Sequence, residues 1–108
     1  MTRRSTGGLK GKWRIVAMSA FETDHLDLVE PAYIALDGKG RGEIVFGALR
    51  ATLECGVASD AADFDWHGFD EMDEVTGNGS VELQPNGSLD GEFAYDNGDE
   101  SSLNAKPW

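Results

Sequence analysis

The chain of 108 residues has one cysteine, three prolines and no long apolar run. A single thiol, Cys55, cannot form an internal disulfide, which fits a reducing compartment such as the cytoplasm. No apolar stretch is long enough to span a bilayer, and none follows the first basic residues as it would in a signal peptide. The sequence therefore predicts a cytoplasmic protein without a membrane anchor.

Basic residues are also scarce. The chain has nine Lys and Arg and twenty Asp and Glu, which gives a net charge of −11. Five of the nine lie in the first fourteen positions and every acid lies after position 20, so residues 15–108 hold four basic against twenty acidic side chains. Such a surface repels phosphate backbones, so nucleic acid is not an expected partner. Cations and basic protein surfaces are favoured, although solubility or adaptation to high salt would also explain the charge.

The length allows one domain with one core. Residues 1–8 have no apolar periodicity and end in a glycine pair, which predicts a disordered tail. Residues 9–108 are expected to form a single β-barrel domain. In it a short helix, Asp24 to Glu30, ends before Pro31 and has Leu26 and Val29 on one face. Apolar residues otherwise recur with period two, the spacing of half-buried strands. The expected strands are 12–19, 32–37, 43–46, 48–55, 63–67, 80–84, 89–95 and 100–106.

Glycine-rich turns such as Asp37–Gly42, Pro85–Gly87 and Asp96–Asp99 connect these strands as in β-hairpins. No segment alternates strands with long helices, as a parallel sheet requires. The predicted fold is all-β: a small antiparallel up-and-down barrel of about eight strands with one short helix after the first strand. Closure buries the apolar faces and removes exposed edges. A β-sandwich is the alternative.

The opening residues Gly11-Lys-Trp13-Arg-Ile-Val16, followed by Phe21 and a short helix, resemble the start of the calycin barrels, the lipocalins and fatty-acid-binding proteins. In lipocalins a basic residue of the last strand packs across that tryptophan, a role which the resemblance gives to Lys106. The wider pattern also resembles a family of small bacterial proteins of unknown function. It comprises Gly-Lys-Trp-Arg-Ile, Phe64-x-Trp66-x-Gly68-x-Asp70-Glu71-x-Asp73 and Gly98-Asp99-x-Ser101.

The calycin resemblance implies a small apolar ligand inside the barrel. If a cavity exists, the residues that would line it are Trp13, Phe46, Phe64, Trp66, Phe93 and Tyr95. An interior of eight short strands is wide enough for side chains or for one small ligand. The same aromatic residues can therefore fill the interior without a ligand, and the sequence leaves both possibilities open.

Residues 63–74 hold six of the twenty acids and one of the two histidines, so this stretch is the first candidate for a functional site. Alternation places Phe64 and Trp66 in the core and turns Asp63, Asp65 and His67 outward. Gly68 is expected to break the strand, after which Phe69 and Met72 cap one mouth of the barrel.

The same stretch approaches the spacing of a calcium loop. A histidine at the third ligand position, Asp70 where an apolar residue is expected, and flanking strands exclude an EF-hand. What remains is an oxygen-rich surface that binds a divalent cation weakly, or a solvated acidic turn. The candidate ligands are Asp63, Asp65, His67, Asp70 and Glu74. No other cofactor is expected.

Catalysis is the weakest hypothesis. A hydrolase that uses paired carboxylates needs a cleft that shifts the pKa of one of them, and no motif supplies a nucleophile beside His67. His25 is expected on the surface, and Cys55 is expected to be a buried, inert thiol. The sequence thus favours a non-enzymatic, acidic β-barrel binding module that contacts a basic protein surface or a cation. A calycin-like carrier of a small apolar ligand is the alternative.

Overall fold

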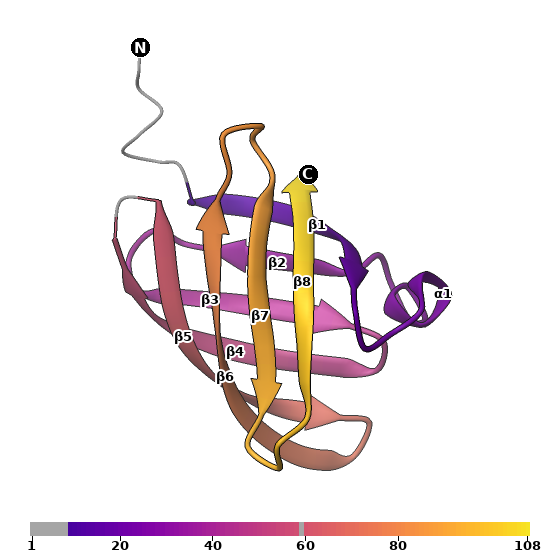
Figure 1. Ribbon diagram of the computed structural model, residues 1–108. Helices are drawn as coiled ribbons and strands as arrows, with labels where there is room; N and C mark the ends of the chain where they lie inside the picture. Colours follow the sequence, from indigo (N-terminus) through magenta and orange to yellow (C-terminus); the bar gives the residue numbers. More distant parts are fainter. Residues whose placement is uncertain (1–8, 59) are drawn as a thin grey trace.

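The chain folds into an all-antiparallel, closed barrel of eight strands with one short helix after the first strand (Figure 1). The computed structural model describes residues 9–58 and 60–108. Each strand pairs with its neighbours in the sequence, and β8 pairs back with β1 to close the barrel. The predicted up-and-down barrel is confirmed and the sandwich alternative is wrong. The predicted tail, residues 1–8, lies outside the described residues.

The helix α1 spans Thr23–Leu26. The strands are β1 (Gly11–Met18), β2 (Tyr33–Leu36), β3 (Arg41–Phe46), β4 (Leu49–Val57), β5 (Ala61–Asp70), β6 (Asp73–Leu83), β7 (Leu89–Tyr95) and β8 (Glu100–Pro107). Among the described residues, no helix has the length and apolar character to cross a membrane.

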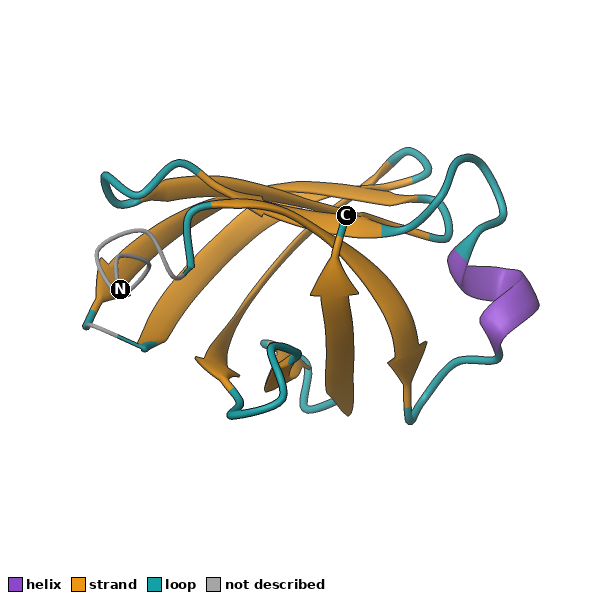
Figure 2. Ribbon diagram, turned by 90° about the horizontal axis from the view of Figure 1, so that it is seen from above, coloured by secondary structure: helices purple, strands orange, loops and turns teal. Residues whose placement is uncertain are grey.

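The antiparallel order gives the barrel two distinct ends (Figures 1 and 2). One end, called the helical end below, carries α1 and the β3–β4, β5–β6 and β7–β8 turns. The other, called the terminal end, carries the β2–β3, β4–β5 and β6–β7 connections, Leu9 before β1 and Trp108 after β8. Two backbone hydrogen bonds join neighbouring parts of the helical end: Gly47 N–H donates to Leu26 O (2.8 Å), and Glu71 N–H donates to Ala48 O (3.3 Å).

Alternation defines the core in most strands, since the inward side chains of β4, β5 and β7 are those that period two selects. The first strand departs from it. A bulge between Ile15 and Ala17 shifts the pairing with β8, and the shift turns Met18 inward and leaves Ala17 exposed. An extra residue in one strand reverses the face of everything after it, so the alternation that buries Trp13 and Ile15 does not extend to Ala17.

Two inward-facing glycines of β6 make room for the largest side chains of β5. Gly77 lies opposite Trp66 and Gly79 lies opposite Phe64. A Cβ on Gly77 would lie 2.6 Å from the Trp66 ring, and one on Gly79 would lie 2.6 Å from the Phe64 ring. Each aromatic ring therefore covers bare backbone on the neighbouring strand, a pairing that also lets a barrel strand bend sharply.

The helix is shorter than predicted. It ends at Leu26, which is buried, whereas Val29 is 70% exposed and does not share its face. The carboxylate of Asp27 accepts the Ala32 N–H at 3.0 Å and pairs with Arg14 at 2.6 Å. These contacts hold the segment after α1 against the barrel as an irregular loop.

Lys106 does not pack across Trp13 as the lipocalin resemblance implies. It is exposed and lies opposite Arg14 on the outer face. The Trp13 side chain is buried, and its indole N–H donates to Leu9 O at 3.1 Å. Another cation contacts the aromatic rings near the end of the chain, because Lys12 Nζ lies 4.0 Å from the centre of the Trp108 ring and 4.3 Å from that of Tyr33.

Candidate interaction surface

The acidic stretch divides between one strand and one turn. Asp63, Asp65 and His67 are exposed on the outer face of β5, as alternation predicts, while Phe64 and Trp66 are buried. The strand does not break at the glycine that follows His67; it continues to Asp70 and returns as β6 through a two-residue turn.

The expected cap over one mouth of the barrel is absent. Gly68 faces inward, and a Cβ there would lie 2.1 Å from Arg50 O, so this glycine lets β4 and β5 approach closely. Phe69, the next residue, consequently points outward and is 51% exposed, and Met72 at the tip of the turn is 95% exposed. The prediction that these two residues cap the barrel is wrong, because it assumed a strand that ended at Gly68.

The five candidate metal ligands do not converge. Asp63, Asp65 and His67 follow one another along the outer face of β5, and alternation turns Asp70 to the opposite face. His67 Nε2 lies 2.5 Å from a carboxylate oxygen of Glu74, an exposed pair on neighbouring strands. Within the part of the chain that the structure describes, no three His, Cys, Asp or Glu side chains are grouped so that they could hold a metal ion.

Carboxylates instead face each other across the outer wall. Asp65 of β5 lies directly opposite Glu54 of β4, and Glu82 of β6 lies opposite Asp90 of β7. All four side chains are exposed. Like charges in opposing positions destabilise a sheet, so the fold itself does not require this arrangement. Period two accounts for acids on the polar face of each strand, but only the register brings them together.

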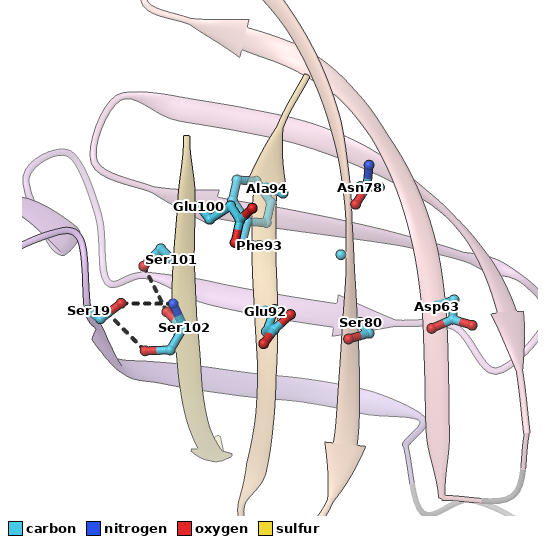
Figure 3. Close-up of a pocket in the computed structure, with 11 residues that line it drawn as sticks. Ser19, Asp63, Asn78, Ser80, Glu92, Phe93, Ala94, Glu100, Ser101 and Ser102 are labelled. Atoms are coloured by element: carbon cyan, nitrogen blue, oxygen red, sulfur yellow. Dashed lines mark hydrogen bonds between the residues drawn. The ribbon is translucent and has the colours of Figure 1, made fainter. Parts of the chain in front are cut away.

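A shallow polar depression of about 490 Å³ lies on the outer wall over β6, β7 and β8 (Figure 3). At one edge, Ser19 and Ser102 form reciprocal hydrogen bonds, each backbone N–H donating to the other hydroxyl (2.9 and 3.3 Å). These bonds extend the β1–β8 contact beyond the strand ladder. The carboxylates that line the depression are Asp63, Glu92 and Glu100.

Charge is distributed unequally between the two ends of the barrel. Eleven of the twenty acids lie in the turns and strand ends of the helical end, and we call them the acidic rim. They are Glu22, Asp24, Asp27, Glu30, Asp70, Glu71, Asp73, Glu74, Asp96, Asp99 and Glu100. Of the seven Lys and Arg among the described residues, five lie toward the terminal end: Lys10, Lys12, Lys39, Arg41 and Lys106. The barrel is thus electrically polar along its length.

The other two basic residues, Arg14 and Arg50, form ion pairs with carboxylates. Arg14 pairs with Asp27 at 2.6 Å, and Arg50 pairs with Glu30 at 2.5 Å and with Glu43 at 2.8 Å. The hydrogen bond to Glu43 is the main cause that raises the pKa of the Arg50 guanidinium. These three acids are partly sheltered, whereas most of the rim is exposed. Arginine therefore neutralises only Asp27 and Glu30 of the rim.

Aromatic rings occupy the barrel interior around Phe93, which is fully buried. Its ring stacks on Trp66 at a centroid distance of 4.6 Å and meets Phe46 edge-on at 5.3 Å. Tyr95 lies 5.6 Å and Phe64 lies 6.5 Å from the same ring. Five of the six predicted lining residues thus pack on one another; the sixth, Trp13, is buried against Leu9.

Tyr95 closes this aromatic cluster toward the helical end and is half-buried. Loss of solvent around the phenol, and then the nearby carboxylates of Asp70 and Asp99, raise the pKa of Tyr95 to about 12. The phenol therefore stays neutral at physiological pH and adds no charge to the rim.

His25 and Cys55 both pack against neighbouring parts of the barrel. The His25 ring stacks on Phe21 at 5.3 Å and covers Gly47, so it helps α1 pack against the β3–β4 turn. Cys55 is a free thiol, partly buried against the core, and burial raises its pKa. A thiol with a raised pKa holds less of the reactive thiolate.

Comparison of the chain with protein-family models, with curated proteins and with solved structures gives no match. The resemblance to calycins stays a prediction, and the function has to be argued from the surface itself.

Proposed function

We propose that this protein is a non-enzymatic binding module whose acidic rim contacts a basic protein surface. The observation that carries the proposal is the separation of charge, with eleven acids at the helical end and five of seven described cations toward the other end. Complementary potentials steer encounter and exclude partners of like charge. A basic partner is therefore drawn to one end of the barrel in particular.

Exposure of the rim supports contact rather than catalysis. Asp24, Asp73 and Asp96 are exposed, so each can reach a partner. A hydrolytic pair would require one carboxyl in a sheltered cleft that raises its pKa. The alternative function, carriage of an apolar ligand, needs space inside the barrel. A ligand could enter the interior only if the Phe93 ring moved away from the Trp66 ring on which it stacks.

The proposal is tested with a lysine-rich peptide titrated calorimetrically into the full chain over a series of salt concentrations. Binding should be measurable at low salt and should weaken as salt rises, because the Debye length shrinks from about 30 Å at 0.01 M to about 10 Å at 0.1 M. An acidic peptide of equal length is the negative control. No heat from the lysine-rich peptide at low salt would sink the proposal.

Paired variants locate the contact. Asp24→Asn with Asp73→Asn removes two charges from the rim, and Asp60→Asn with Glu82→Gln removes two charges away from it. Both doubles have the same net charge. The rim double should weaken binding more than its control, and equal weakening would show that net charge rather than the rim attracts the peptide.

A further inference from the structure

The helical end also exposes large apolar side chains, which charge alone does not explain. Four of the six large apolar side chains that are exposed among the described residues lie there. They are Leu28 (63% exposed), Val29 (70%), Phe69 (51%) and Met72 (95%), and we call them the apolar patch. The other two, Val57 and Trp108, lie at the terminal end.

Hydrogen bonds and ion pairs connect the parts of the chain that carry the patch. Glu30, next to Val29, holds the Arg50 guanidinium at 2.5 Å, and Arg50 lies opposite Phe69 in the β4–β5 register. The β3–β4 turn bonds to α1 on one side and to the β5–β6 turn, which carries Met72, on the other. Figure 1 shows α1 and these two turns one after another along the same end of the barrel. The patch is thus spread over adjoining segments.

The charge around the patch defines the chemistry of its occupant. Six rim acids lie within two residues of patch members: Asp27, Glu30, Asp70, Glu71, Asp73 and Glu74. Arg50, which lies opposite Phe69, is already bound by two carboxylates, and Arg14 is bound by Asp27. A purely apolar partner would leave the rim unmatched, and a purely cationic partner would leave the patch in water. Apolar patches ringed by polar groups mark protein contact sites.

We propose that the helical end docks a basic amphipathic segment of another protein, with its apolar side chains on the patch and its Lys or Arg side chains on the acidic rim. This inference rests on the proposed function and specifies its partner. A second copy of this chain fits poorly, because its own net charge of −11 opposes the approach of another copy.

The probe is a synthetic helical peptide with leucines on one face and lysines on the other, compared with a scrambled peptide of the same composition. Amide chemical shifts of the labelled full chain are followed by NMR. The amphipathic peptide should bind more tightly than the scrambled one and shift the amides of Leu28, Val29, Phe69 and Met72. Its binding should persist at a salt concentration that releases the lysine-rich peptide, because apolar contact is not screened.

The variant Val29→Ser with Met72→Ser should weaken the amphipathic peptide about tenfold, the size of a modest interface contribution. It should leave the lysine-rich peptide unchanged. Val57→Ser, a substitution of an exposed apolar residue at the other end, should change neither. Thermal melts of all variants check that the fold persists.

The outcomes separate the two proposals. If the scrambled and amphipathic peptides bind equally, or if the shifts gather around Val57 and Trp108, the inference is overturned while charge-led binding stands. If neither peptide binds at low salt, both proposals fail. Sedimentation that showed a dimer dissociated by Met72→Ser would also overturn the inference, in favour of self-association.

Discussion

The backbone at Glu71 provides a sharp test of the turn that carries Met72. Glu71 has φ of +59°, the only positive φ at a non-glycine position among the described residues. It is the first of the two residues in the β5–β6 turn, the position where type II′ turns take glycine. A side chain in the left-handed region costs about 1–2 kcal/mol, and glycine avoids that cost.

Glu71→Gly should therefore stabilise the barrel. Glycine also gains freedom in the unfolded chain, which offsets about 0.4–1 kcal/mol of the relief. The net gain is about 1 kcal/mol, which corresponds to a rise in Tm of about 4–8 °C for a domain near this size. Thermal and urea unfolding measure it.

Glu71→Gln is the matched control, because it removes the same charge but keeps the side chain in the strained conformation. Loss of one acid near Asp70 and Asp73 relieves some repulsion in both variants, and high salt suppresses that part. The difference between Gly and Gln isolates the backbone term and should survive high salt. If the Gly variant is no more stable than the Gln variant, the reasoning from φ is refuted.

Three further perturbations probe the core, the outer wall and pH. Phe93→Ala should cost about 3–5 kcal/mol in urea unfolding, since it empties the centre of the aromatic cluster, and a loss below about 1 kcal/mol would contradict a packed interior. Glu54→Gln should add about 0.2–1 kcal/mol at low salt by relieving repulsion from Asp65, and a gain that persists at high salt would argue against this cause. The folded-state pKa of Tyr95, about 12, lies above the ordinary tyrosine value, so its contribution is intact below about pH 10 and is lost as pH rises through 12. Allowing for solvent screening of a half-exposed group, the loss is about 1 kcal/mol; denaturation at several alkaline pH values should show it, and Tyr95→Phe should abolish it.

Strand periodicity was sufficient to predict the barrel. In β4 every second residue from Leu49 is apolar, and in β7 Leu89, Phe93 and Tyr95 keep the same spacing around Gly91. The turns have their glycines in place, so the local pattern and the final register agree. The same rule correctly divided residues 63–67 into a core face and a polar face. In these strands the inward side chains themselves fill the adjoining part of the barrel interior.

Periodicity failed where the space is filled by another strand. Only residues 80–84 were expected as a strand, yet β6 begins at Asp73, because Gly77 and Gly79 contribute no side chains and the rings of β5 supply the packing. The same reason applies to Gly68, whose tight contact with β4 exists only in the folded barrel and leaves no pattern in the sequence.

The acidic character of the candidate surface could be predicted from the sequence, but the set of residues that form it could not. Clustering of acids in residues 63–74 indicated a charged surface, but the rim also draws on α1 and the β7–β8 turn, which are distant in sequence. The exposure of Val29 and Met72 differs from the pattern, which puts Val29 on the same helix face as Leu26 and Met72 over a mouth of the barrel. Which residues share an end is a property of topology, and spacing along the chain does not encode it.

The closure of the barrel has a consequence for how the chain folds. Seven of the eight strand pairings join neighbours in the sequence, so each closes a short stretch of chain with a small loss of chain entropy. The eighth joins Arg14 to Lys106 and spans nearly the whole chain. Long-range pairings form slowly because loop closure must precede their contacts. The β1–β8 seam, with its bulge and its Ser19–Ser102 bonds, is therefore the step expected to set the folding rate.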